Sequence, residues 1–472
     1  MATGVREIRK QYNPANTSEC VGKVELHTAQ EAEEKIDACE RAFQGWSRMS
    51  SVARGEILHA LADLLIEHME PLAELASKEM GKTVPETIGE VKRGASILRY
   101  FSQEGMRATG EVLPSACEDK MLFTKRVPLG VVAIITPWNF PVAIPLWKMA
   151  PALVYGNTVV WKPSIEVSLT SQYIAGLFVK AGLPENVLNI VLGRGSKLGP
   201  ILVQSPKVKA VSFTGSNAVG QQILKTAGPL NKKIQLELGG KNAAIILADA
   251  DLDLAARLTI EGAMKQTGQR CTATSRVYIE APVYDAVVEK LVKYAKEIKV
   301  GETMGPLASK QQFDSVLEHI ERAKRQGAKC IFGGKPVQEL PHGYFIEPTL
   351  FTEVAHEMDL AREEVFGPVL AIFKVADYEE AIRLANDSEF GLSASIYTTD
   401  IQKGFDFIER SEVGLVQIND ETGGAEPQAP FGGMKNSSTG FREQGQAAKE
   451  FFTAIKTVTI NGTRIKPTQH QK

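Results

Sequence analysis

The sequence predicts an α/β fold made of two doubly wound, Rossmann-type domains and a small β arm. Its 472 residues are too many for one ordinary hydrophobic core. From Gly130 onward, short apolar runs that stop at turn residues alternate with segments of helical periodicity, and a second series follows Cys271. Short apolar runs between helices are typical of strands buried in a parallel sheet.

The segments before residue 130 are expected to include amphipathic helices. Thr28 and Glu31 have the spacing of a capping box at the start of the first helix. Apolar residues then recur at helical spacing in two successive segments. They are Ile36, Cys39, Phe43 and Trp46 in the first segment, and Ile57, Leu58, Leu61, Leu64 and Leu65 in the second. Both helices should cover a core, with Cys39 as a core residue.

The predicted strands fall into two series. The first comprises 130–135, 157–161, 187–191, 210–213, 234–236 and 243–247, with a helix over 169–181. The second includes 276–280, 369–374, 393–397 and 415–418. The two series meet near Glu237 and Cys271, and ligands bind preferentially at such junctions and at the carboxyl ends of parallel strands.

Two segments fit neither series. Residues 111–127 are typical of a β-hairpin, and residues 450–460 of a late strand. Because exposed strand edges are normally covered, we expect both segments to pair with another subunit.

Composition and charge exclude several classes of function. A formal net charge of -2, with scattered Lys and Arg, argues against a nucleic-acid partner. The polar start of the chain and the lack of a long apolar run predict neither a secretory signal nor a membrane span. The 7 histidines form no HExxH motif, so no metal site is expected. The 5 cysteines form no CxxC pair, which favours a reducing, cytoplasmic location.

One short stretch carries the main chemical signal. Gly268-Gln269-Arg270-Cys271-Thr272 sets a thiol among small and polar residues, and Glu237 precedes it on a Gly-Gly turn. Cys271 is the candidate nucleophile and Glu237 its candidate base. On the residues alone, a buried structural cysteine is about equally compatible with this pattern.

A second signal suggests a nucleotide cofactor. Phe213-Thr214-Gly215-Ser216 follows a predicted strand, and Gly220 comes four residues after Ser216. Glycines at a strand-to-helix turn allow backbone N–H groups to approach a phosphate. The spacing is not GxGxxG, so an ordinary turn stays an alternative. Lys162, at the end of an earlier strand, is suited to meet a ribose or phosphate, or else is a solvated lysine.

Taken together, the motifs cover nearly the whole chain. They are Thr136-Pro137-Trp138-Asn139-Phe140-Pro141, Trp161-Lys162-Pro163, Phe213-Thr214-Gly215-Ser216, Glu237-Leu238-Gly239-Gly240-Lys241, Gly268-Gln269-Arg270-Cys271, Glu363-Glu364-Val365-Phe366-Gly367-Pro368 and Pro430-Phe431-Gly432-Gly433. In this order they resemble the aldehyde dehydrogenase superfamily. The resemblance implies an aldehyde dehydrogenase fold and oxidation of a small aldehyde to its acid.

The resemblance also implies catalytic roles at matching positions. Cys271 would attack the aldehyde carbon, giving a thiohemiacetal and then a thioester. Asn139 and the backbone N–H of Cys271 would form the oxyanion hole. Glu237 would activate the water that hydrolyses the thioester, and Lys148 matches a lysine near the active site.

The same resemblance implies a nicotinamide dinucleotide site. Its expected residues are Thr136, Pro137, Trp138, Lys162, Ser164, Ile165, Gly215, Ser216, Gly220, Leu238, Gly239, Glu364 and Phe366. Lys162 would bind the adenosine ribose, and Glu364 the nicotinamide ribose. NAD-preferring relatives usually carry Glu at the position of Ile165, where a carboxylate repels a 2′-phosphate. We therefore expect NADP or NAD as cofactor, with NADP favoured.

Domain bounds follow from the resemblance and the element pattern. We expect a cofactor-binding domain at 1–110 and 128–238, a catalytic domain at 239–445, and an oligomerisation arm and tail at 111–127 and 446–472. A homodimer or homotetramer is the implied assembly.

Within the superfamily, four segments most resemble 2,5-dioxovalerate (α-ketoglutaric semialdehyde) dehydrogenases. They are 126–130, 141–151, 271–276 and 428–435. Succinic semialdehyde and general aliphatic aldehydes are alternative substrates, although succinic semialdehyde enzymes often carry Arg where Trp147 stands. Arg270 would bind a substrate carboxylate or form a structural salt bridge. A CoA-acylating relative and a non-catalytic, crystallin-like protein are less favoured, because Glu237 and Cys271 are both present.

Overall fold

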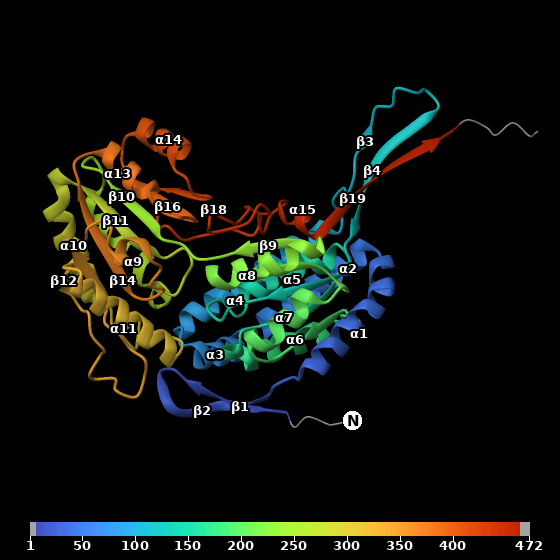
Figure 1. The fold of residues 1–472 in the computed structure, drawn as a ribbon, viewed down its shortest axis with the longest axis horizontal. Helices are drawn as coiled ribbons and strands as arrows, with labels where there is room; N and C mark the ends of the chain where they lie inside the picture. The colour runs from blue at the N-terminus through green and yellow to red at the C-terminus, as the bar shows by residue number, and fades with distance from the viewer. Residues whose placement is uncertain (1–5, 463–472) are drawn as a thin grey trace, which may run out of the picture.

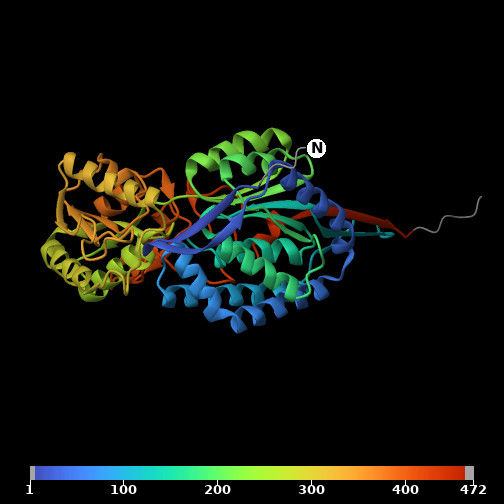
Figure 2. The same cartoon turned by 90° about the horizontal axis from the view of Figure 1, so that it is seen from below.

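The structure, a computed structural model, describes residues 6–462. Two lobes, each built on a mainly parallel sheet, lie side by side, and a thin β arm projects from the first lobe (Figure 1). The view from below shows the N-terminal hairpin running beneath the first lobe toward the second (Figure 2). Among the described residues, no helix is both long and apolar enough to cross a membrane.

The first lobe holds a five-stranded parallel sheet of order β7-β6-β5-β8-β9. Its strands are β5 (Val131–Ile135), β6 (Thr158–Lys162), β7 (Leu188–Ile190), β8 (Val208–Thr214) and β9 (Lys233–Glu237). From β5 the chain first adds strands on one side and then on the other. This reversal opens a crevice between the carboxyl ends of β5 and β8, where ligands bind in sheets of this kind.

Helices cover both faces of this sheet. They are α1 (Ala29–Arg48), α2 (Ser51–Glu67), α3 (Met69–Met80), α4 (Val84–Glu104), α5 (Ala143–Val154), α6 (Ser168–Lys180), α7 (Gly195–Gln204) and α8 (Asn217–Ala227), with short 3-10 turns at Ile165–Val167 and Gly228–Leu230. Val132 and Ile134 of β5 point into one core and Val131 and Ala133 into the other. This alternation is why the strands read as continuous apolar runs.

The second lobe holds a seven-stranded sheet of order β12-β13-β14-β11-β10-β16-β17. Its strands are β10 (Asn242–Ile246), β11 (Thr274–Glu280), β12 (Lys329–Phe332), β13 (Thr349–Thr352), β14 (Val369–Val375), β16 (Ser393–Tyr397) and β17 (Leu415–Ile418). All neighbouring pairs are parallel except β12 with β13.

The helices of this lobe again lie on both faces of the sheet. They are α9 (Leu252–Met264), α10 (Tyr284–Glu297), α11 (Lys310–Arg325), α12 (Asp359–Arg362), α13 (Tyr378–Asn386) and α14 (Ile401–Arg410), with 3-10 turns at Lys265–Gly268 and Ala281–Val283. A two-stranded ribbon, β15 (Phe390–Gly391) with β18 (Met434–Lys435), closes one edge. The two-domain α/β prediction is confirmed, and each strand of the two predicted series is present with bounds that differ by at most two residues. The segment 243–247, predicted as part of the first series, is instead β10 in the middle of the second sheet, because the chain crosses to the second lobe after Glu237.

The N-terminal hairpin connects the two lobes. Strands β1 (Ile8–Asn13) and β2 (Asn16–Glu25) pair with each other. Near their turn, Tyr344 N–H donates to the Pro14 carbonyl (2.9 Å) and Thr17 N–H to the His342 carbonyl (2.8 Å). The capping box predicted at the start of α1 is present, with Thr28 as N-cap.

The arm consists of β3 (Val112–Leu113), β4 (Lys120–Pro128) and β19 (Thr453–Asn461), in the order β19-β4-β3. Strand β19 pairs with β4 along its whole length, from Thr453 opposite Pro128 to Asn461 opposite Lys120. We expected both segments to pair with another subunit, but within the chain they pair with each other. The expected strand also begins later, because Ala448–Phe452 forms helix α15 and packs into the first core.

Candidate active site

Eight of the thirteen predicted cofactor residues come together around a cavity of about 640 Å³ at the crevice between β5 and β8. The lining includes Thr136, Pro137, Trp138, Lys162, Ser164, Ile165, Gly215 and Ser216. Each follows or ends a strand of the first sheet, so the parallel topology gathers them at one edge. The hydroxyl of Thr214, which also lines the cavity, is buried without a partner among the described residues. The size, the Gly turn before α8 and this free polar group fit a dinucleotide.

Lys162 is held inside this cavity rather than in solvent. Its ammonium donates to the Pro163 carbonyl at 3.0 Å, and the residue is 3% exposed. Burial lowers the pKa of Lys162 to about 8, while the charge of Glu166 opposes that shift. A buried amine with one protein acceptor has further donors for a ribose or phosphate.

The sequence analysis missed Glu166, which lines the same cavity beside Ile165. Its carboxylate accepts a hydrogen bond from the Ser164 hydroxyl at 2.7 Å and forms an ion pair with Arg9 at 3.3 Å. The Ile165 side chain packs against a small apolar cluster that includes Val24. In the sequence, Glu166 cannot be told from an ordinary surface glutamate. The 3-10 turn at Ile165–Val167 is what brings Glu166 to the cavity.

Three predicted cofactor residues lie at the crossing between the sheets. Leu238 N–H donates to the Ser437 carbonyl at 2.8 Å, and its side chain packs on Gly220, where an added Cβ would lie 2.7 Å from a Leu238 methyl. Gly239 N–H donates to the Asn217 side-chain oxygen at 3.0 Å. Leu238, Gly239 and Gly220 therefore hold α8 against the crossing and do not line the large cavity.

Glu364 and Phe366 approach the same crossing from the second lobe. Glu364 accepts the Gly240 N–H at 2.9 Å, and burial raises its pKa to about 7. The rings of Phe366 and Trp138 meet edge to face, with centroids 5.6 Å apart. Phe366 has a positive φ of 55°, a left-handed conformation that is uncommon for a bulky residue.

Cys271 lines a second cavity, of about 300 Å³, together with Phe140, Trp147 and Phe431. Burial, followed by the carboxylates of Glu364 and Glu237, raises the pKa of the Cys271 thiol to about 12. The thiol is therefore protonated at neutral pH in the protein without a bound cofactor. The residue precedes β11, so it lies at the amino end of the second sheet, facing the carboxyl ends of the first.

Two hydrogen-bond donors belong to or contact the loop that carries this thiol. Asn139 is buried, and its amide nitrogen donates to the Gln269 carbonyl at 3.0 Å, which leaves its second N–H free. Among the described residues, the backbone N–H of Cys271 donates no hydrogen bond. Both donors are available to an oxygen bound next to the sulfur.

Glu237 ends β9 and is 2% exposed. One carboxylate oxygen accepts from the Ser438 hydroxyl at 2.6 Å, and the other has no partner among the described residues. An added Cβ at Gly432 would lie 2.7 Å from this second oxygen, so the Gly-Gly motif leaves room for the carboxyl group. Burial and then the charge of Glu443 raise the pKa of Glu237 well above its ordinary value.

Lys148 does not line the Cys271 cavity. Its fully buried ammonium pairs with Glu443 and donates to the Ser212 hydroxyl at 3.0 Å. Glu443 in turn acts electrostatically on Glu237. Lys148 therefore reaches the site through Glu443, a residue that the sequence analysis missed because nothing in its local pattern marks it.

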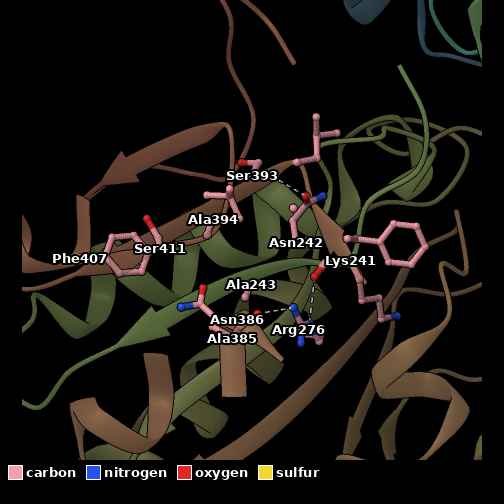
Figure 3. A pocket seen from close by; sticks show the side chains of 14 residues that line it. Lys241, Asn242, Ala243, Arg276, Ala385, Asn386, Ser393, Ala394, Phe407 and Ser411 are labelled. Atoms are coloured by element: carbon pink, nitrogen blue, oxygen red, sulfur yellow. Dashed lines mark hydrogen bonds between the residues drawn. The ribbon is translucent and has the colours of Figure 1, made fainter. Parts of the chain in front are cut away.

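Buried polar groups beneath the crossing, among them Asn242, Ser393 and Arg276, are joined by hydrogen bonds (Figure 3). The Asn242 amide donates to the carbonyls of Cys271 (2.7 Å) and Ala273 (2.9 Å), and its oxygen accepts from Ser393 N–H at 3.1 Å. Arg276 donates to the Lys241 carbonyl at 2.9 Å. These bonds join β10, β11 and β16 into one rigid support for the loop.

Arg270 forms a structural salt bridge. Its guanidinium donates to a Glu421 carboxylate oxygen at 2.9 Å and to the Gly262 carbonyl at 2.6 Å. Lys265 binds the same Glu421 side chain at 3.1 Å. Of the two roles considered for Arg270, the geometry favours the salt bridge. Among residues 6–462, no group of three or more His, Cys, Asp or Glu side chains is arranged to hold a metal ion.

Comparison with known proteins agrees with this arrangement. Residues 2–458 match the aldehyde dehydrogenase family. An alpha-ketoglutaric semialdehyde dehydrogenase of Bacillus subtilis (strain 168) is 50% identical over 462 residues, covering 96% of this chain and 95% of the relative. A 2,5-dioxopentanoate dehydrogenase of Saccharolobus solfataricus is 43% identical, covering 96% of each chain. The crystal structure of betaine aldehyde dehydrogenase from Staphylococcus aureus with NAD+ has a TM-score of 0.94 at 35% identity, covering 99% of this chain and 94% of that one.

The raised pKa of Cys271 predicts how its alkylation depends on pH. Because thiolate is the reactive form, the alkylation rate of the cofactor-free protein by iodoacetamide should rise about tenfold per unit from pH 7 to pH 9, without levelling off. Peptide-resolved mass spectrometry separates Cys271 from the exposed Cys20 and Cys117. A plateau below pH 9 would contradict the prediction.

Proposed function

The chain belongs to the aldehyde dehydrogenase family and is an NAD(P)-dependent oxidoreductase of aldehydes, and we propose that its substrate is a small semialdehyde such as 2,5-dioxovalerate. The observation that carries this proposal is a cavity of about 300 Å³ that contains the Cys271 thiol and is walled by Trp147 and Phe431. This volume lies at the small end of ligand sites, which favours a short substrate. The names of the relatives at 50% and 43% identity support the same substrate. Succinic semialdehyde and simple aliphatic aldehydes are the alternative substrates.

Cys271 begins the reaction by adding to the aldehyde carbon. The S–H bond breaks with its proton taken up by water, an S–C bond forms, and the carbonyl oxygen becomes the oxyanion of a thiohemiacetal. The free N–H groups of Asn139 and Cys271 stabilise this oxygen, and removal of one such donor typically costs about 10²–10³ in rate. Loss of hydride from the former aldehyde carbon then gives a thioester on Cys271.

The residues around the large cavity bind the nicotinamide cofactor, which accepts that hydride when it is bound. Lys162 binds the adenosine ribose, and the turn at Gly215 and Ser216 contacts the phosphates. Glu364, with Phe366 and Trp138 beside it, holds the nicotinamide ribose. NADP is favoured over NAD, because Ile165 brings no charge to the cavity and Glu166 is already bound by Ser164 and Arg9.

Glu237 completes the cycle by activating water. Water adds to the thioester carbon, the C–S bond breaks, and the products are the carboxylic acid and the free thiol. The carboxyl group must be ionised to accept the proton, and its raised pKa makes this step faster as pH rises. The Lys148–Glu443 ion pair acts on Glu237 through its charges, Glu443 opposing and Lys148 favouring the ionisation of the Glu237 carboxyl group.

Two other functions are less well supported. A CoA-acylating enzyme needs no base, whereas Glu237 is buried next to Gly432 with one oxygen free. A structural, crystallin-like protein needs no nucleophile, whereas Cys271 lies in a cavity. Product analysis with and without CoA separates the first alternative, and cofactor reduction excludes the second.

The arm is assigned to assembly. Val112, Met121, Ile455 and Ile460 on its strands are each more than half exposed. Exposed apolar edges of this kind are normally covered by a partner, which supports a homodimer or homotetramer. The proposed division assigns cofactor binding to 1–110 and 128–238, catalysis to 239–445, and the arm and tail to 111–127 and 446–472, although α15 within the last segment packs into the first core. The five unpaired cysteines favour a cytoplasmic enzyme.

Replacement of Cys271 with Ala tests the nucleophile. The variant should lose dehydrogenase activity with 2,5-dioxovalerate and retain cofactor binding, because covalent catalysis is removed while the dinucleotide cavity is untouched. Steady-state reduction of NAD and NADP measures the first property, and fluorescence titration the second. Turnover above about one per cent of the wild-type rate would contradict the assignment.

Replacement of Glu237 with Gln tests the base. Hydride transfer should still occur once, so stopped-flow absorbance should show a burst of reduced cofactor near one per site, followed by slow turnover. Gln retains the size and the hydrogen bond to Ser438. Normal steady-state turnover would mean that another group activates the water.

Replacement of Ile165 with Glu tests the cofactor preference. A carboxylate there should repel the 2′-phosphate and accept from a free 2′-hydroxyl, moving the NADP/NAD ratio of kcat/KM about tenfold or more toward NAD. Glu166→Gln is the matched control: because Glu166 is already bound by Ser164 and Arg9, its replacement should change the ratio little. An unchanged ratio in the Ile165 variant would remove the basis for NADP preference.

A further inference from the structure

Arg93, in the Cys271 cavity, packs over the Trp147 ring but has no carboxylate partner among the described residues. It lies on α4 and lines that cavity with Cys271 and Trp147. Among residues 6–462, its side chain forms no hydrogen bond and no ion pair, although its Nε is fully buried. Its guanidinium carbon lies 5.7 Å from the centroid of the Trp147 ring. A half-buried guanidinium whose buried Nε has no acceptor can still donate to a ligand, so the site favours an anion.

The carboxylates that face Arg93 are already bound elsewhere. Glu90, the nearest on its own helix, accepts from the Lys82 ammonium at 2.7 Å. It also accepts the backbone N–H groups of Val142 (2.7 Å) and Ala143 (2.8 Å). Glu90 therefore fixes the start of α5 and does not pair with Arg93.

The other two acidic residues of the cavity are also occupied. Glu421 is shared by Arg270 and Lys265. Glu86 caps α4 through Thr83 and accepts the Gln266 N–H at 2.7 Å. Arg270 forms its ion pair with Glu421. Of the two arginines that line this cavity, Arg93 is therefore the one without a carboxylate partner among the described residues.

Trp147 supplies a second unused donor next to Arg93. Its indole Nε1 is buried with no acceptor among the described residues, and its ring packs against Phe431 with centroids 5.4 Å apart. An indole N–H and a guanidinium can only donate, and an ionised carboxylate can only accept. The guanidinium and the indole N–H can therefore both donate hydrogen bonds to a carboxylate, whereas neither can form a hydrogen bond with a methyl group.

We propose that Arg93, together with the indole N–H of Trp147, binds the carboxylate at the far end of the substrate while Cys271 attacks its aldehyde. The ligand class is a short aldehyde that carries a carboxylate. The inference rests on the proposed semialdehyde function and deepens it, because it identifies the residues that select the charged substrate over a neutral one. The sequence offered Arg270 for this role, and the salt bridge to Glu421 moves the role to α4.

The test compares two substrates that differ at one end only, 5-oxopentanoate and pentanal, with 2,5-dioxovalerate as a third. The wild-type enzyme should prefer the two carboxylates. Arg93→Met should lower kcat/KM for the carboxylates about 10- to 100-fold, mainly through KM, because a charged hydrogen bond is lost. It should leave pentanal within about threefold of wild type, since no contact to a methyl group changes. Arg99→Met is the matched control. Arg99 is on the same helix but is exposed and paired with Asp63, so its replacement should leave kcat/KM unchanged for all three substrates.

Further variants keep the result interpretable. Arg93→Lys retains the charge and should keep part of the preference for carboxylate substrates. If Arg93→Met does not fold, Arg93→Gln takes its place in the test and should lose that preference. Trp147→Phe retains the ring and should weaken carboxylate binding less than the Arg93 variants. Glutarate should inhibit the wild type competitively and the Arg93→Gln enzyme weakly. If the wild type shows no preference for carboxylates, the semialdehyde function is wrong. If it does and the Arg93 variants keep that preference, the assignment of Arg93 is overturned.

Discussion

The whole site depends on a side-chain-free crossing of the backbone between the two sheets. An added Cβ at Gly239 would lie 2.5 Å from a Glu364 oxygen, and one at Gly240 would lie 2.7 Å from the Cys271 carbonyl oxygen. The crossing leads from the carboxyl end of β9, where Glu237 lies, to the amino end of β10. Because no side chain separates them here, Glu364 and the Cys271 loop approach the first lobe closely.

The two sheets contribute different chemistry to this junction. The first presents the carboxyl ends of its strands, whose turns hold a dinucleotide cavity. The second presents amino ends, and the nucleophile lies on a loop held by Asn242. Burial raises the pKa values of three groups at the junction, because a charged form is disfavoured where water is excluded. They are Cys271, Glu237 and Glu364. Each of these groups is therefore harder to ionise than it would be in water.

Charge pairing also explains why the two arginines at the Cys271 cavity differ in their capacity to bind a ligand. Arg270 and Arg93 both border the Cys271 cavity. Arg270 is neutralised by Glu421, while the carboxylate near Arg93 is committed to Lys82 and the start of α5. A pairing pattern of this kind, rather than the presence of arginine, decides which side chain can meet a ligand.

The sequence by itself determined the two α/β lobes, the strands and the residues with family motifs, because strand periodicity and turn chemistry are local properties. It also predicted, through the resemblance that its motifs carry, that Cys271, Glu237 and Asn139 belong to one site. Only the tertiary structure decided that β4 pairs with β19, that Lys148 acts from behind Glu443, and that Glu166 and Arg93 border the cavities. These features depend on contacts between residues that are far apart in the chain. The local sequence around a charged residue does not show whether its side chain is buried or which residue it will contact.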